Sequence, residues 1–121
     1  MKRFIIPLVL LMTTFSACQE EEKPLQSVKL STQELETLLF TREEEKLAFD
    51  VYNYAYEKYG LNVFQNIASS EKQHINAILA VMAANNIADP LNGNITRGIF
   101  SDPVLQELYH SLTAEVDQSL E

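Results

Sequence analysis

The sequence predicts an all-α fold, in which two long antiparallel helices are followed by a short third helix. Hydrophobic residues recur at helical spacing through most of the chain, without the two-residue alternation of half-buried strands. Its 121 residues include only three glycines and four prolines, so few positions interrupt long helices. This length allows a single domain.

The first helix is predicted over residues 32–59. Ser31 and Glu34 have the spacing of a capping box, in which each side chain accepts a hydrogen bond from the backbone N–H of the other residue. Gly60 follows, and glycine readily adopts the left-handed conformation that ends helices. The helix is therefore expected to begin after Ser31 and to end at Gly60.

The second helix is predicted from Asn62 to about residues 85–86, with the Asn62 side chain as its N-cap and Gln65 three residues later. The connection to the first helix is short, which favours antiparallel packing of the two helices. One face of the second helix carries an apolar stripe, made of Phe64, Ile67, Ala68, Ile75, Ile78 and Met82.

Turn-forming residues predict a loop over 88–98, and the third helix is expected to begin with Asp102 as N-cap and Pro103 at the first helical position. Its buried residues are predicted to be Leu105, Leu108 and Leu112. The pattern weakens after Glu115, and residues 119–121 are expected to open another helix.

Residues 1–17 have the features of a bacterial lipoprotein signal peptide. Lys2 and Arg3 precede an apolar core that is too short for a bilayer span of roughly 20 residues. The Ser-Ala-Cys sequence ending at Cys18 resembles a lipobox, so we expect Cys18 to be lipidated, with palmitate among its acyl chains, and to bind the membrane. An ordinary secretory signal with a free Cys18 thiol is the alternative.

Residues 18–29 are predicted to be a disordered acidic tether, because they have no apolar face to bury. Their acidic run resembles a surface-export signal, and a solvated spacer is the simpler alternative. The expected location is the bacterial cell envelope, at the outer membrane or the cell surface. Residues 30–121 form the expected domain.

The composition excludes several function classes. Cys18 is the single cysteine, which rules out an intramolecular disulfide and a cysteine metal cluster. Nine basic and seventeen acidic residues give a net charge of −8, which disfavours a nucleic-acid partner. No phosphate-binding loop or nucleophile elbow occurs.

Acidic residues on the two long helices predict a metal site. Glu71 and His74 are three residues apart, so they project from one face, on the apolar stripe of the second helix. Glu44 is predicted to be the inward acid of the first helix, because it shares a face with apolar residues (Leu47, Ala48, Val51 and Ala55), whereas Glu43 and Glu45 point about 100° to either side. A buried carboxylate needs a compensating charge.

Carboxylates with an imidazole suit iron, manganese or zinc. One inward Glu with one Glu-x-x-His is half of the ligand set of a four-helix di-iron site. The alternative is that both motifs are ordinary solvated, salt-bridged surface. Glu107 and His110 form a second Glu-x-x-His, which we interpret as structural because it lies on the short helix.

The motifs resemble an uncharacterised bacterial branch of the ferritin-like superfamily, over nearly all of the chain after the tether. The resemblance implies half of a ferritin-like four-helix bundle, with Glu44, Glu71 and His74 as ligands of a di-iron site. The chain stops where a third long helix is expected, so the site would be completed by a longer chain or by a homodimer. The matching segments are 39–52, 59–60, 63–74, 98–100, 105–109 and 118–121.

Two functions are compatible with these features. The first is a lipid-anchored ferritin-like protein that binds iron and oxidises Fe(II) with O₂. The second is a metal-free, lipid-anchored helical interaction module. Iron bound per chain distinguishes them.

Overall fold

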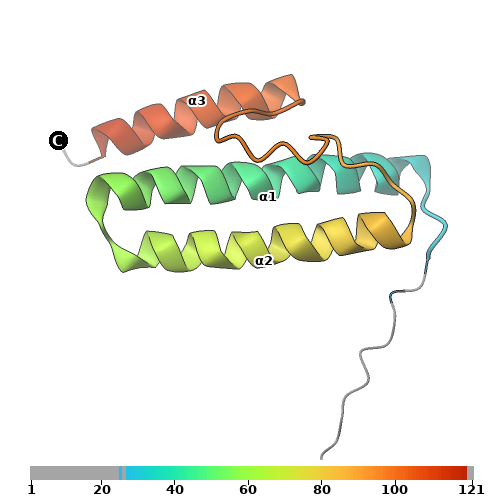
Figure 1. Cartoon of the computed structure of the whole chain (residues 1–121). Coiled ribbons are helices and arrows are strands. Elements are labelled where there is room, and N and C mark those ends of the chain that lie inside the picture. Colours follow the sequence, from blue (N-terminus) through green and yellow to red (C-terminus); the bar gives the residue numbers. More distant parts are fainter. Residues whose placement is uncertain (1–24, 26, 120–121) are drawn as a thin grey trace, which may run out of the picture.

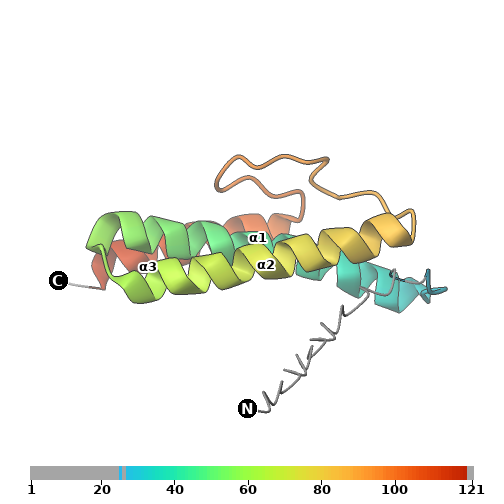
Figure 2. The same cartoon turned by 60° about the horizontal axis from the view of Figure 1, so that its bottom comes forward.

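The computed structural model describes Leu25 and residues 27–119, and its fold is all-α as predicted. Helix α1 spans Thr32–Tyr59, α2 spans Asn62–Ala84 and α3 spans Pro103–Gln118. Helix α1 lies between the other two: α2 packs antiparallel on one side of it, and α3 packs on the other side and runs in the direction of α1 (Figures 1 and 2). The predicted signal peptide and Cys18 lie outside the described residues.

Both ends of α1 are confirmed. The Ser31 backbone N–H donates to Glu34 Oε2 at 2.8 Å, and the Glu34 N–H donates to Ser31 Oγ at 3.3 Å, which completes the capping box. Gly60 has a left-handed φ of 66°, and its N–H donates to the Tyr56 carbonyl at 2.8 Å. These caps are local, so the sequence alone located them.

The prediction that Asn62 caps α2 is wrong. The N-cap is Leu61, in an extended conformation and with no side-chain capping bond, and Asn62 is already the first helical residue. The turn at Gly60 needs only one further extended residue before the chain can enter α2, so the cap position falls on a leucine. Helix α2 then ends at Ala84, one residue short of the predicted end.

The core has two parts. Between α1 and α2, the buried side chains are all apolar: Ala55, Ala68, Ile75 and Met82. The rest of the predicted α2 stripe is half-buried. On the opposite side of α1, a second cluster joins α1 to Phe100 and α3, and consists of Leu47, Val51, Phe100 and Leu105 with Tyr109, Leu112 and Val116 packed against it.

The start of α3 is confirmed, with Asp102 accepting from the Val104 and Leu105 N–H groups and Pro103 as the first helical residue. Leu105 is buried, as expected, whereas Leu112 is only half-buried. The prediction for Leu108 is wrong, because 40% of this residue is exposed on the outer face of α3. Ser119, where a further helix was expected to open, is the C-cap of α3, and residues 120–121 lie outside the described residues.

Residues 85–102, here called the α2–α3 connection, run along α1 (Figure 1). They give partners to buried charges of α1. Lys46 pairs with Asp50 at 2.5 Å and donates to the Thr96 carbonyl at 2.8 Å. Asp50 also accepts from the Gly98 N–H at 3.0 Å. The charged run of α1, which resembled a solvated turn in the sequence, is therefore partly internal.

Glu43 is 3% exposed and holds the start of α3. Its carboxylate accepts from the Ser101 N–H at 2.7 Å and from the Asp102 N–H at 3.3 Å, as well as from the Ser101 hydroxyl.

Within the part of the chain that the structure describes, no helix is both long and apolar enough for a bilayer span.

Candidate metal site

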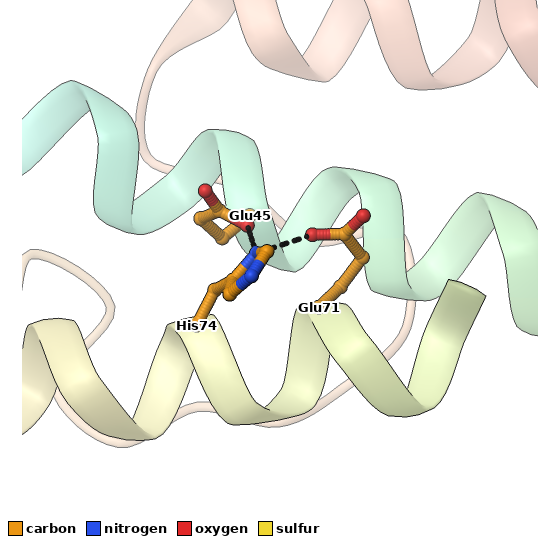
Figure 3. Close-up of side chains that lie close together, drawn as sticks. All are labelled: Glu45, Glu71 and His74. Carbon is orange, nitrogen blue, oxygen red and sulfur yellow. Dashed lines mark hydrogen bonds and ion pairs between the residues drawn. The ribbon is translucent and has the colours of Figure 1, made fainter. Parts of the chain in front are cut away.

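Three side chains meet between α1 and α2: Glu45 from α1, and Glu71 and His74 from α2 (Figure 3). His74 Nδ1 lies 3.1 Å from Glu45 Oε2 and 3.0 Å from Glu71 Oε2. Each residue offers one ligand atom, and these atoms all lie within 4.8 Å of one another. Two carboxylates and an imidazole therefore converge on one point.

The helices position these groups. Glu71 and His74 lie one turn apart on α2, so their side chains share a face, as the sequence predicted. Antiparallel packing places Glu45 of α1 opposite them (Figure 3). The side chains of Glu71 and Glu45 are 18% and 24% exposed, whereas that of His74 is 54% exposed. The site is thus at the edge of the helix interface and open to solvent on the His74 side.

The predicted orientation of Glu44 is wrong. Glu44 is exposed and lies outside the cluster, and its neighbour Glu45 takes the expected place. The face used for the prediction contains Leu47 and Val51, which pack with Phe100 and Leu105 of α3. The face toward α2 is about 100° away, where the next residue projects. The structure thus brings the predicted Glu71 and His74 together with Glu45, which the sequence reasoning had placed outside the candidate site.

The electrostatics of the cluster favour a bound cation. Burial, followed by the proximity of Glu71, raises the pKa of Glu45. Hydrogen bonds to Glu71, and then to Glu45, raise the pKa of His74, because both carboxylates stabilise the imidazolium. When His74 is protonated, its imidazolium balances the charge of the two acids in this cluster. A divalent metal ion can supply the same positive charge.

The second Glu-x-x-His does not contribute to this site. His110 Nε2 lies 3.1 Å from the side-chain nitrogen of Gln106, and the Gln106 amide also donates to the Gly98 carbonyl. Glu107 is exposed. The structural interpretation of Glu107 and His110 agrees with these contacts.

Fold and site together define a helical protein in which two antiparallel helices hold a carboxylate–imidazole cluster. Residues 34–121 match the family described as an uncharacterized protein domain, DUF2202, and the chain belongs to this family. It is 44% identical over 90 residues to the uncharacterized protein MJ0754 of Methanocaldococcus jannaschii, a match covering 74% of this chain and 48% of the relative. The chain thus spans about half the length of this curated relative.

The fold is shared with a solved structure. The crystal structure of the hypothetical protein MJ0754 from Methanococcus jannaschii superimposes with a TM-score of 0.76 at 42% sequence identity. The match covers 81% of this chain and 55% of the solved chain. The two proteins are therefore similar in sequence as well as in the arrangement of their helices.

Proposed function

We propose that this chain is half of a ferritin-like bundle and that Glu45, Glu71 and His74 bind a metal ion, iron in the first place. The observation that carries the proposal is the convergence of their ligand atoms within 4.8 Å across the α1–α2 interface. The ligands come from two rigid helices, which is typical of metal sites in helical bundles. This replaces Glu44 with Glu45 in the ligand set expected from the sequence.

The donor set fits the metal. Carboxylate oxygens and an imidazole nitrogen bind iron, manganese and zinc. In this site Glu45 and Glu71 would provide the negative charge, and His74 would provide a neutral donor after losing its proton. These residues would hold iron, and the chemistry that such a centre would supply is the oxidation of Fe(II) by O₂. The exposed side of His74 leaves a route by which solvent and small molecules reach the cluster.

The described part of one chain brings three candidate ligands together, and four-helix di-iron sites use four carboxylates and two histidines. Two copies of Glu45, Glu71 and His74 provide that set, so we propose that a homodimer completes the site. The match covers 48% of MJ0754. The second arrangement is therefore a longer chain, in which further helices of the same chain would provide the missing ligands. Metal would then stabilise the completed bundle, because it binds only the assembled form.

The test is equilibrium binding of Fe(II) without oxygen, measured as iron per chain. We expect Glu45→Gln to weaken binding by at least tenfold, because it removes a charged ligand. The matched control is Glu44→Gln, which removes the same charge one residue away at an exposed position and should change binding little. Equal affinities of the two variants, or no binding by the wild type, would contradict the proposal and favour the metal-free interaction module.

We further propose that Cys18 carries lipid and holds the domain at a bacterial envelope membrane. The support is the basic start, the short apolar core and the Ser-Ala-Cys sequence. Mass spectrometry of the protein from its native host should show an acylated Cys18 as the first residue. An unmodified Cys18 thiol would contradict the anchor and leave the metal site unaffected.

A further inference from the structure

Arg42 of α1 is a buried cation whose hydrogen bonds are incomplete. It is 4% exposed, and its Nη2 atom makes a single 3.2 Å bond to Asp89 of the α2–α3 connection. Its Nε and Nη1 atoms are buried and have no partner among the described residues. Arg97, by contrast, makes a two-bond pair with Glu57 at 2.7 and 2.5 Å, although it is exposed. Buried guanidinium groups normally satisfy their donors.

A cavity of about 40 Å³ lies beside Arg42, beneath the α2–α3 connection. Three cationic side chains line it: Arg42 and Lys46 from α1, and Lys72 from α2. The lining carboxylate, Asp50, already accepts from Lys46 and from the Gly98 N–H. The cavity therefore has an excess of positive charge and of unused donors.

The geometry points to a binding site for one small inorganic anion, of halide size, between α1, α2 and the connection. On this measure a single water needs about 10–15 Å³, so the cavity has room for one monatomic ion. An anion would accept from the free Arg42 donors and balance the charge of Lys72. Burial strengthens such an interaction, because solvent screens it less. This site is distinct from the Glu45, Glu71 and His74 cluster, whose charge attracts cations.

Bromide is a suitable probe because it scatters anomalously and resembles chloride in size. Crystals of the full chain soaked in sodium bromide should show an anomalous peak within hydrogen-bond distance of Arg42. In solution, thermal unfolding is compared in sodium bromide and in sodium methanesulfonate at equal concentration. When the bromide concentration is about ten times the dissociation constant of the site, we expect the Tm to be roughly 5 °C higher in bromide than in methanesulfonate.

Variants separate binding from general salt effects. Arg42→Gln and Lys72→Gln should lose the difference between the two salts, and Lys72 is exposed, so its replacement leaves the fold intact. Arg97→Gln, the matched control, removes an arginine that lies outside the cavity lining and should keep the difference. Salt responses that are identical in the wild type and in both cavity variants, or water density in place of the bromide peak, would overturn the proposal.

Discussion

His74 Nδ1 lies 3.1 Å from a carboxylate oxygen of Glu45 on the facing helix, and the two residues are 29 positions apart in the sequence. The same nitrogen lies 3.0 Å from Glu71 on its own helix. One atom of α2 thus links the two acids across the interface. Of the three consecutive glutamates 43–45, Glu45 is the one that contacts His74.

The buried pair Lys46–Asp50 should be important for stability. We expect Asp50→Ala to lower the free energy of unfolding by about 3–5 kcal/mol, because it leaves the Lys46 ammonium buried without its counter-ion. Chemical denaturation measures the change. Glu57→Ala is the control: it breaks the exposed pair with Arg97 and should cost less than about 1 kcal/mol. Similar losses in both variants would contradict the internal role of Lys46.

Two glycines with positive φ should differ in their tolerance of alanine. At Gly60 an added Cβ meets open space, so Gly60→Ala should cost only the left-handed conformation, about 1–2 kcal/mol. At Gly98 the Cβ would lie 2.6 Å from the Tyr109 ring, which adds about 1–3 kcal/mol of overpacking. Unfolding free energies of the two variants test this order. A smaller loss for Gly98→Ala would show that Tyr109 moves freely.

The N-terminus of α2 can be improved. Leu61 occupies the N-cap without a capping bond and is 51% exposed. Leu61→Asp should stabilise the protein by about 0.5–2 kcal/mol, because aspartate accepts from the free N–H groups of the first turn. Asn62→Ala should have little effect on the Tm, since Asn62 is not the cap. A large loss in Asn62→Ala would restore the original assignment.

Acid should weaken the contact between the ends of α1 and α3. Lys58, and then Tyr54, hydrogen-bond the Asp117 carboxylate and lower its pKa below the ordinary value of 3.8. The folded pKa is the lower one, so the stabilisation is complete above the unfolded pKa and is lost as the pH falls through the folded pKa. The stability difference between wild type and Asp117→Asn should therefore shrink toward pH 2. A difference independent of pH would exclude this contribution.

The features that were predictable from sequence are local ones. The capping box of Ser31 and Glu34, the glycine at 60 and the Asp102–Pro103 start of α3 are each defined by neighbouring residues. The spacing of Glu71 and His74 likewise fixes their shared face.

The features that were missed depend on tertiary contacts. Leu47 and Val51 appeared to mark the side of α1 that faces α2, but they pack against α3 and Phe100. Because Glu44 shares a face with Leu47 and Val51, it was predicted to be the ligand from α1. The burial of Lys46 and Asp50 depends on backbone groups at Thr96 and Gly98, nearly fifty residues away. The spacing of hydrophobic residues does not predict hydrogen bonds between positions so far apart in the sequence.

Anomalous diffraction from a crystal soaked with Fe(II) without oxygen, measured at the iron absorption edge, tests the central claim most directly. We expect a peak between α1 and α2, at about 2.0–2.2 Å from oxygens of Glu45 and Glu71 and from a ring nitrogen of His74, by analogy with other divalent metals. An absent peak, or one coordinated by Glu44 in place of Glu45, would contradict the proposed site.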